Sequence, residues 1–272
     1  MAFPEFFKNK TTYWLCASFI LLAGISYLQV LHLYQDHQLT EAASNSRIER
    51  DENITRKRLT LGHKIPSFGF DNIISNWTFL SFLQYFGDDI SRKQVGYELS
   101  YDFFKVITAK DPRFLTPYIY LTNSVSIYAG SPEKAISLMQ AGLEKMSPTT
   151  PNRSYLVWRY KGTDELLFLG DGQAAEQSFR TAAQWADKSD DPESNEISQL
   201  SLQTAQFLAK NPHSREAQIG AWSQVLVRAV NLDTREIAIQ RIEELGGEVV
   251  LSDQGRVEIR HRVDEINNSI SQ

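Results

Sequence analysis

The sequence has few of the residues on which disulfide and metal chemistry depends. Its only cysteine is Cys16, which excludes an intrachain disulfide and a cysteine-based metal site. Its five histidines include no pair at the i, i+3 or i, i+4 spacing that places two ligands on one face of a helix. They are His32, His37, His63, His213 and His261. We therefore predict no metal site.

The sequence also lacks the common motifs of catalytic and nucleotide-binding sites. It contains no His-Glu-x-x-His, no Gly-x-Ser-x-Gly, no Gly-x-x-x-x-Gly-Lys and no Gly-x-Gly-x-x-Gly. Solvation at helix ends explains its acid pairs, at 88–89 and 190–191, at least as well as acid catalysis does. We predict no catalytic residue, no cofactor and a protein that is not an enzyme. The alternative is an envelope enzyme accessory, or a hydrolase with an unrecognised site.

An excess of basic charge is missing as well. The chain has 28 lysine and arginine residues against 33 aspartate and glutamate residues, a net charge of −5. Nucleic-acid binding normally needs a concentrated basic face that displaces counterions from phosphates. We therefore expect no nucleic-acid partner. With 42% hydrophobic residues among 272, the chain can nevertheless bury a substantial core.

Charged residues are absent from one long stretch, YWLCASFILLAGISYLQVLHLY at 13–34. Its length matches the roughly 20 residues that a helix needs to cross hydrocarbon. Aromatic rings flank it, and Lys8 and Lys10 precede it, as is typical of membrane spans with a cytoplasmic N-terminus. We predict a cytoplasmic segment at 1–12, a transmembrane anchor in the lipid bilayer at 13–34, and a body on the periplasmic or lumenal side. A cleaved secretory signal is the alternative.

The rest of the chain divides into a polar segment and a helical body. Residues 35–66 have no sustained apolar face, which predicts a linker or a helical stalk. From 67 to 272, apolar residues recur at helical spacing between short breaks, and no alternation of period two persists. We predict an all-α body of about ten helices in antiparallel hairpins. Its stretch DNIISNWTFLSFLQYFGDD, at 71–89, predicts a helix packed on two sides, with contact to a partner as the alternative.

Two stretches of the body, 130–142 and 170–182, share a spacing of small and large residues. In each, glycine is followed by alanine after five residues, a large apolar residue four later and a small residue three later. The glycine allows a sharp turn, the small residues allow close helix approach, and the large residue fills the groove of the partner helix. The two sets are Gly130, Ala135, Met139, Gly142 and Gly170, Ala175, Phe179, Ala182. This pattern resembles the second half of a tetratricopeptide repeat, which would place repeats at 115–146 and 154–187; a generic helical hairpin is the alternative.

The order of these segments resembles a family of membrane-anchored, tetratricopeptide-repeat-like proteins of cyanobacteria and other bacteria. The likeness rests on the apolar run, the polar segment, NWTFLSFLQYFGDD at 76–89, KDPRF at 110–114 and the two hairpins. It implies a single N-terminal transmembrane helix followed by an α-solenoid, in a thylakoid or another membrane. It further implies a scaffold or assembly factor whose protein partners are photosynthetic or other membrane complexes.

A helical-repeat array presents a concave face, built from the first helix of each pair, that accepts a peptide or a helix of another protein. We therefore predict that one stripe on the two first helices contacts the partner, since tyrosine offers large contact area with a polar tip. Its residues are Tyr120, Ser124, Ile127, Tyr160, Asp164 and Leu167. Ordinary packing between helices is the alternative for the stripe. For the whole chain, a carrier of an apolar ligand is a further alternative.

Overall fold

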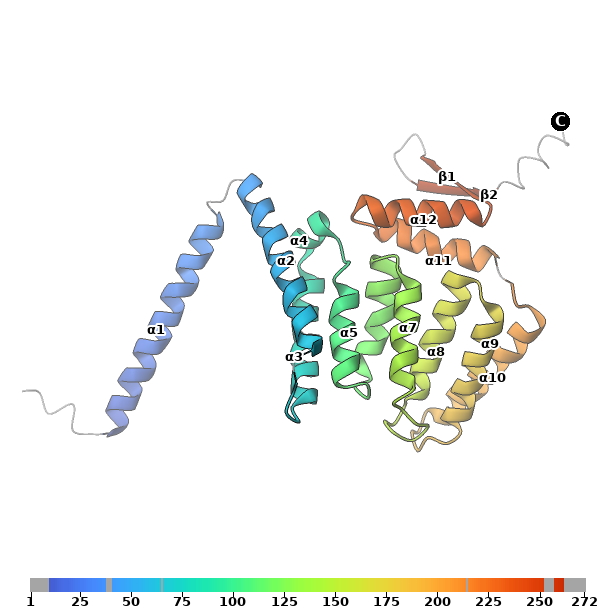
Figure 1. Ribbon diagram of the computed structural model, residues 1–272, viewed down its shortest axis with the longest axis horizontal. Coiled ribbons are helices and arrows are strands. Elements are labelled where there is room, and N and C mark those ends of the chain that lie inside the picture. The colour runs from blue at the N-terminus through green and yellow to red at the C-terminus, as the bar shows by residue number, and fades with distance from the viewer. Residues whose placement is uncertain (1–9, 38–40, 65, 214, 252–256, 262–272) are drawn as a thin grey trace, which may run out of the picture. The chain divides into compact units, whose positions relative to one another are not determined.

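The computed structural model describes residues 10–37, 41–64, 66–213, 215–251 and 257–261 (Figure 1). The chain divides into two units, residues 1–50 and 51–272. Most of the predicted cytoplasmic segment, residues 1–9, lies outside the described residues. The helices are α1 (Lys10–His37), α2 (Glu41–Lys64), α3 (Asp71–Gly87), α4 (Asp89–Val95), α5 (Ser100–Lys110), α6 (Thr116–Leu121), α7 (Pro132–Leu143), α8 (Tyr155–Asp164), α9 (Gly172–Ala186), α10 (Ser194–Lys210), α11 (Arg215–Arg228) and α12 (Leu232–Glu244). Two π-helical segments, η2 (Thr122–Tyr128) and η3 (Glu165–Leu169), extend α6 and α8.

The transmembrane anchor expected at 13–34 is wrong. These residues do form a helix, as part of α1. Over the part of the chain that the structure describes, however, no helix combines the length and the apolar character that crossing a membrane requires. The expectation rested on the length of the run, its lack of charge and its flanking residues, whereas a span needs about 20 residues that are apolar nearly throughout, and Ser18, Ser26 and Gln29 interrupt this run. The predicted bilayer contact and single-pass location, with a periplasmic or lumenal body, are wrong for the same reason.

The helical body is confirmed, but it ends in a short β-hairpin that the sequence pattern did not predict. Strands β1 (Gly247–Leu251) and β2 (Val257–His261) pair antiparallel, with Val249 opposite Ile259. The chain leaves α12 through Gly246, whose φ of 85° lies in the left-handed region that favours glycine. Valine and isoleucine are common in strands because they pack well on a pleated surface. Five-residue strands are too short to show a sustained alternation.

The C-terminal half of the predicted stalk packs onto the body instead of standing free. Leu59 of α2 is buried in the main hydrophobic cluster. Glu52 of α2 forms an ion pair with the buried Arg92 of α4, with 3.0 Å between the carboxylate and the guanidinium. A buried charge needs such a partner, because an uncompensated one is costly to remove from water. These contacts make residues 51–64 part of the second unit.

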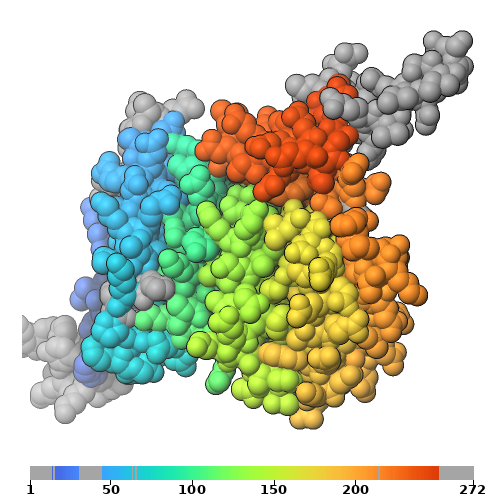
Figure 2. Space-filling model, turned by 45° about the vertical axis from the view of Figure 1, so that its right-hand side comes forward, coloured from blue at the N-terminus to red at the C-terminus, as the bar shows by residue number. Residues whose placement is uncertain are grey.

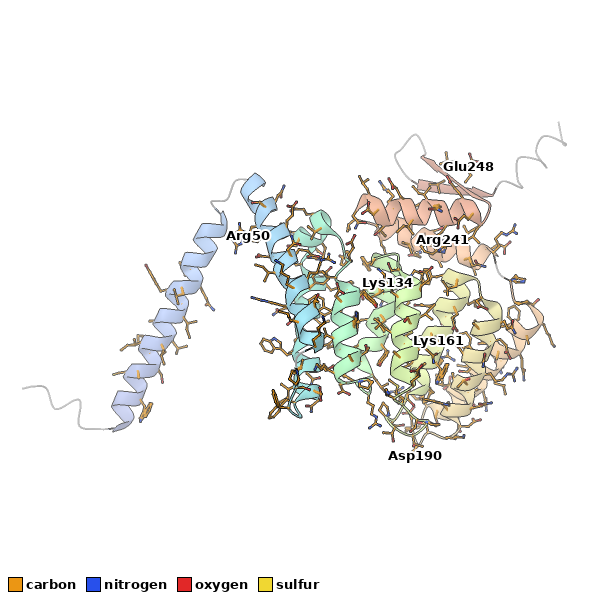
Figure 3. All side chains as sticks on the ribbon, in the orientation of Figure 1. Arg50, Lys134, Lys161, Asp190, Arg241 and Glu248 are labelled. Carbon is orange, nitrogen blue, oxygen red and sulfur yellow. The ribbon has the colours of Figure 1, made fainter. Side chains whose placement is uncertain are left out.

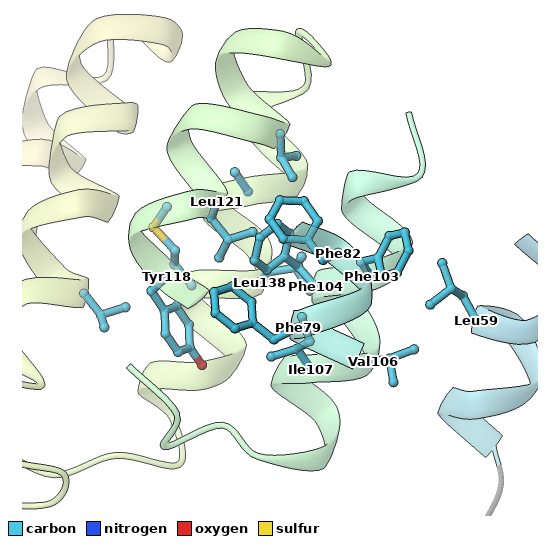
Figure 4. Packing of buried hydrophobic residues seen from close by; sticks show 14 of the residues in the cluster. Leu59, Phe79, Phe82, Phe103, Phe104, Val106, Ile107, Tyr118, Leu121 and Leu138 are labelled. Carbon is cyan, nitrogen blue, oxygen red and sulfur yellow. The ribbon is translucent and has the colours of Figure 1, made fainter. Parts of the chain in front are cut away.

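The core of the second unit is aromatic at its N-terminal end. Phe82 of α3 is fully buried, and its ring lies 4.5 Å from that of Phe104 and 5.9 Å from that of Phe103, both on α5 (Figure 4). Phe79 on the same face of α3 meets Tyr120 at 5.4 Å in an edge-to-face arrangement. Such ring pairs contribute about 0.5–1.5 kcal/mol beyond the area that they bury. The buried residues of α3 all lie on one side, so the expected packing of this helix on two sides is not what the structure shows.

Small residues let the two arms of each hairpin approach closely. One hairpin consists of α6 with η2 followed by α7, and the other of α8 with η3 followed by α9. The turn glycines Gly130 and Gly170 have φ of 58° and 68°, which only glycine adopts readily. A Cβ on Gly142 would collide with the phenol of Tyr118, so glycine lets α6 approach α7. The other members of the two predicted sets are all buried: Ala135, Met139, Ala175, Phe179 and Ala182. Whether the hairpins are tetratricopeptide repeats stays a prediction.

The C-terminal helices α11 and α12 lie across the turn ends of these hairpins (Figures 1 and 2). The indole Nε1 of Trp222 on α11 donates a hydrogen bond of 3.2 Å to the backbone oxygen of Phe168 in η3. The last carbonyls of a helix have no partner within it, so this donor satisfies one of them. Arg241 lies on α12 (Figure 3). Its guanidinium reaches the carboxylate of Glu133 at the start of α7, with 3.1 Å between the charged groups. The helices α11 and α12 therefore tie both hairpins together at one edge.

Candidate functional site

The predicted partner stripe points largely into the core. Ser124 and Asp164 have no exposed surface, so neither touches a partner in this arrangement. Tyr120 is partly buried against the main cluster, and its ring lies 5.4 Å from Phe79 and 6.2 Å from Phe82. The remaining members are also partly buried, Tyr160 against the main cluster and Ile127 and Leu167 against the cluster around Trp222. The i, i+4, i+7 spacing marks the packed face of these helices.

A buried hydrogen bond links η2 to the C-terminal end of α8. The hydroxyl of Ser126 in η2 donates a hydrogen bond of 2.6 Å to Oδ2 of Asp164, the last residue of α8. Burial raises the pKa of the Asp164 carboxyl to about 7, because the charged form loses its hydration. The hydrogen bond from Ser126 opposes this shift, and the hydroxyl of Thr122 is near enough to do the same, although it lies outside hydrogen-bond geometry. Within the described part of the chain, Oδ1 of Asp164 has no hydrogen-bond partner.

The next residue, Glu165, anchors a second polar cluster between α8 and α9. Its carboxylate accepts a hydrogen bond of 2.6 Å from the hydroxyl of Ser178 and pairs with the ammonium of Lys161. Lys161 also donates a hydrogen bond of 3.2 Å to Ser178. All three polar groups are therefore satisfied, as buried charges require. The cluster fixes how α9 packs against α8.

A carboxyl that titrates near neutrality is a common feature of acid–base sites. Asp164, however, is enclosed at the boundary of α8 and η3, where no substrate atom could come within hydrogen-bond reach of it. Among the residues that the structure describes, no group of three or more histidine, cysteine, aspartate or glutamate side chains could hold a metal ion. The buried polar links therefore serve packing and specificity between helices.

The outward face of α3 and the turn before it carry a large apolar surface. Positions 70, 73, 77 and 80 fall on one side of a helix at about 100° per residue. Their side chains, with that of Phe68, are more than half exposed: Phe68 86%, Phe70 60%, Ile73 58%, Trp77 72% and Leu80 56%. We call these five residues the α3 surface. Phe68 also has a φ of 48°, a left-handed conformation that is rare for a bulky side chain.

Comparison with protein-family models, with curated proteins and with solved structures finds no match to the chain. The candidate site therefore rests on the geometry of the chain alone. The sequence had indicated the aromatic helix as a partner surface only as an alternative, because an apolar run without alternation does not show which side is buried. The sequence shows that positions 73, 77 and 80 are apolar, but their exposure depends on which helices pack around α3.

Proposed function

We propose that the protein is a helical scaffold that binds another protein through the α3 surface. The exposure of Trp77 and its apolar neighbours is the observation that carries this proposal. At about 200 Å² for each aromatic side chain, Phe68, Phe70 and Trp77 alone offer roughly 400 Å² of apolar surface. Monomeric proteins rarely expose more than a few hundred Å² in one patch, and larger patches commonly mark interaction sites.

The chemistry of α3 favours an amphipathic helix as the partner segment. From Asn72 to Gly87 the helix has no charged residue, so a charged partner face would lose its hydration without gaining an ion pair. Apolar side chains at i, i+4 and i+7 on α3 match the spacing by which one helix packs along another. Tryptophan is also the residue type most enriched among the few that dominate interface energies. The partner segment is therefore expected to carry an apolar stripe and few charges along its contact face.

The identity of the partner is carried only by the family resemblance, which implies photosynthetic or other membrane complexes. No observation on the described residues favours a hydrolase or an enzyme accessory. For an apolar-ligand carrier, two cavities of the described residues are open to solvent and carry charged side chains in their linings. A binding module therefore fits the geometry best.

Site-specific photo-crosslinking tests the proposal. A photoreactive residue is placed at position 77 of the full chain, and a matched one at position 207, where Phe207 of α10 is 62% exposed on a different helix. Irradiation in extracts of the source cells should give a discrete product at position 77 only, and its partner peptide should show apolar residues at i, i+3, i+4 and i+7. Trp77→Glu should abolish recovery of that partner with an unchanged melting midpoint. Equal products from both positions, or recovery unaffected by Trp77→Glu, would refute the α3 surface.

A further inference from the structure

A hollow of about 870 Å³ opens between α5, the loop before α6 and the C-terminal end of α7. Its apolar lining includes Ala109, Pro112, Leu138, Ala141 and Met146. The volume lies within the range of about 300–1,000 Å³ that is typical of ligand pockets. We call this hollow the α5–α7 groove. It shares no residue with the α3 surface.

Three cationic side chains line the α5–α7 groove, and all are exposed: Lys105, Arg113 and Lys145. None of them forms an ion pair within the described residues. The groove also contains two acids, which accept hydrogen bonds from neutral donors and keep their charge: Asp111 accepts the backbone N–H of Arg113 at 3.1 Å, and Glu144 accepts from Gln140 at 3.5 Å. Three cations against two acids leave the lining with one excess positive charge, which favours an anionic ligand.

Arg113 is held in place for such a ligand. Its Nε donates a hydrogen bond of 3.2 Å to the backbone oxygen of Lys145, which joins the two loops that flank the α5–α7 groove. This bond uses only one of the five guanidinium donors and leaves the two terminal nitrogens for a carboxylate. A guanidinium fixed in this way binds a carboxylate with less loss of side-chain freedom than a free arginine does.

We infer that the α5–α7 groove binds an acidic peptide segment with an aliphatic anchor residue. Carboxylates of the peptide pair with Arg113, Lys105 and Lys145, while the aliphatic side chain covers Leu138 and Ala141. A nucleic acid fits less well, because its phosphates and sugars offer no aliphatic side chain to cover the apolar part of the lining at Leu138 and Ala141. The inference goes beyond the proposed function, since it adds a second site with a different ligand chemistry.

Fluorescence anisotropy with the full chain tests the inference. The probe is a fluorescein-labelled peptide, Gly-Glu-Asp-Leu-Glu-Asp-Leu-Gly, and two matched probes replace either its acids by amides or its leucines by serines. The wild-type chain should bind the acidic peptide and lose affinity for either altered probe. Lys145→Glu and Arg113→Gln should each weaken binding about tenfold, the loss expected for one charge-assisted contact. Lys188→Glu, an exposed charge on a different loop, is the matched control and should change affinity little.

The outcomes separate specific binding from general charge attraction. Because Arg113, Lys145 and Lys188 are exposed, the melting midpoints of the three variants should equal that of the wild type. Equal binding of the amide peptide, equal weakening by Lys188→Glu, or no binding by the wild-type chain would overturn the inference. Displacement of the peptide by inorganic phosphate or by an oligonucleotide at lower concentration than by unlabelled peptide would do so too. Trp77→Glu should leave peptide binding intact, so that failure of one site does not count against the other.

Discussion

Replacing Asp164 by asparagine should make the protein more stable at high pH. It should also remove most of the pH dependence that this carboxyl gives to the free energy of unfolding. Asparagine has nearly the same shape, and its amide oxygen can still accept the hydrogen bond from Ser126. It cannot ionise. Because burial raises the pKa of Asp164 from 3.8 to about 7, the wild-type chain must either keep this carboxyl protonated or carry an unpaired buried charge.

Whether stability rises or falls with pH depends on whether the folded or the unfolded chain holds the proton. Between about pH 4 and pH 7 the folded chain holds a proton on Asp164 that the unfolded chain has lost, so the free energy of unfolding falls as pH rises. The stability that protonated Asp164 contributes is fully present below the pKa that this carboxyl has in the unfolded chain. It is lost as pH rises through the pKa that it has in the folded chain. A shift of about three pKa units corresponds to roughly 4 kcal/mol, at 1.36 kcal/mol for each unit. The group is fully buried, so solvent does not screen this effect.

Urea unfolding of the full chain at several values between about pH 4 and pH 8 measures the effect. The difference in unfolding free energy between Asp164→Asn and the wild type should grow with pH in favour of the variant and level off above about pH 7. Asp190→Asn, an exposed acid in the loop between α9 and α10 (Figure 3), is the control and should show no such trend. If the wild type and Asp164→Asn lose stability in parallel across this range, Asp164 is not held protonated and the reasoning fails.

Two further predictions concern packing. Ala175→Leu should lower stability by about 1–3 kcal/mol, because Ala175 is fully buried where α9 meets α10 and a larger side chain overpacks this contact. Gln177→Leu, at an exposed position of the same helix, is the control. Equal melting midpoints for Ala175→Leu and the wild type would contradict the close approach of the two helices. Tyr120→Ala should lower the melting midpoint through lost contact with the core rings, and partner recovery should fall only with the folded fraction. Tyr160→Ala is expected to behave in the same way, and an unchanged midpoint with lost recovery would restore the predicted partner stripe.

The sequence predicted the helices and their turns well because these depend on local signals. Gly130 and Gly170 lie where the chain must adopt positive φ, and the spacing of small residues after them follows from contacts between consecutive helices. The transmembrane anchor was wrongly predicted because length, absence of charge and flanking residues were considered, but not the polar residues Ser18, Ser26 and Gln29 within the run. The β-hairpin was missed because Val249 and Val250 lie in a strand too short to show its period.

The candidate sites were harder to predict because they depend on contacts between distant segments. Tyr120 on α6 and Trp77 on α3 are both aromatic residues of helices, yet Tyr120 packs against the core and Trp77 is left uncovered. No local pattern distinguishes a stripe that faces the core from one that faces solvent when both are apolar. Likewise, the α5–α7 groove joins Lys105 to Lys145 across 40 positions of the sequence, and only the packing of α5 against α7 brings them together.

The two proposed surfaces differ in the physics by which they would hold a ligand. The α3 surface offers apolar area without charge, so its contribution grows with the area covered and is insensitive to salt. The α5–α7 groove offers three cations that form no ion pair within the described residues, beside two acids, and its attraction is screened within about 10 Å at ordinary ionic strength. A scaffold gains from such a difference, because a partner that carries both an amphipathic helix and an acidic segment binds the second site at the raised effective concentration set by its linker. Two weak contacts of different chemistry then give both affinity and selectivity, and a ligand with only one of the two features would be bound weakly and released quickly.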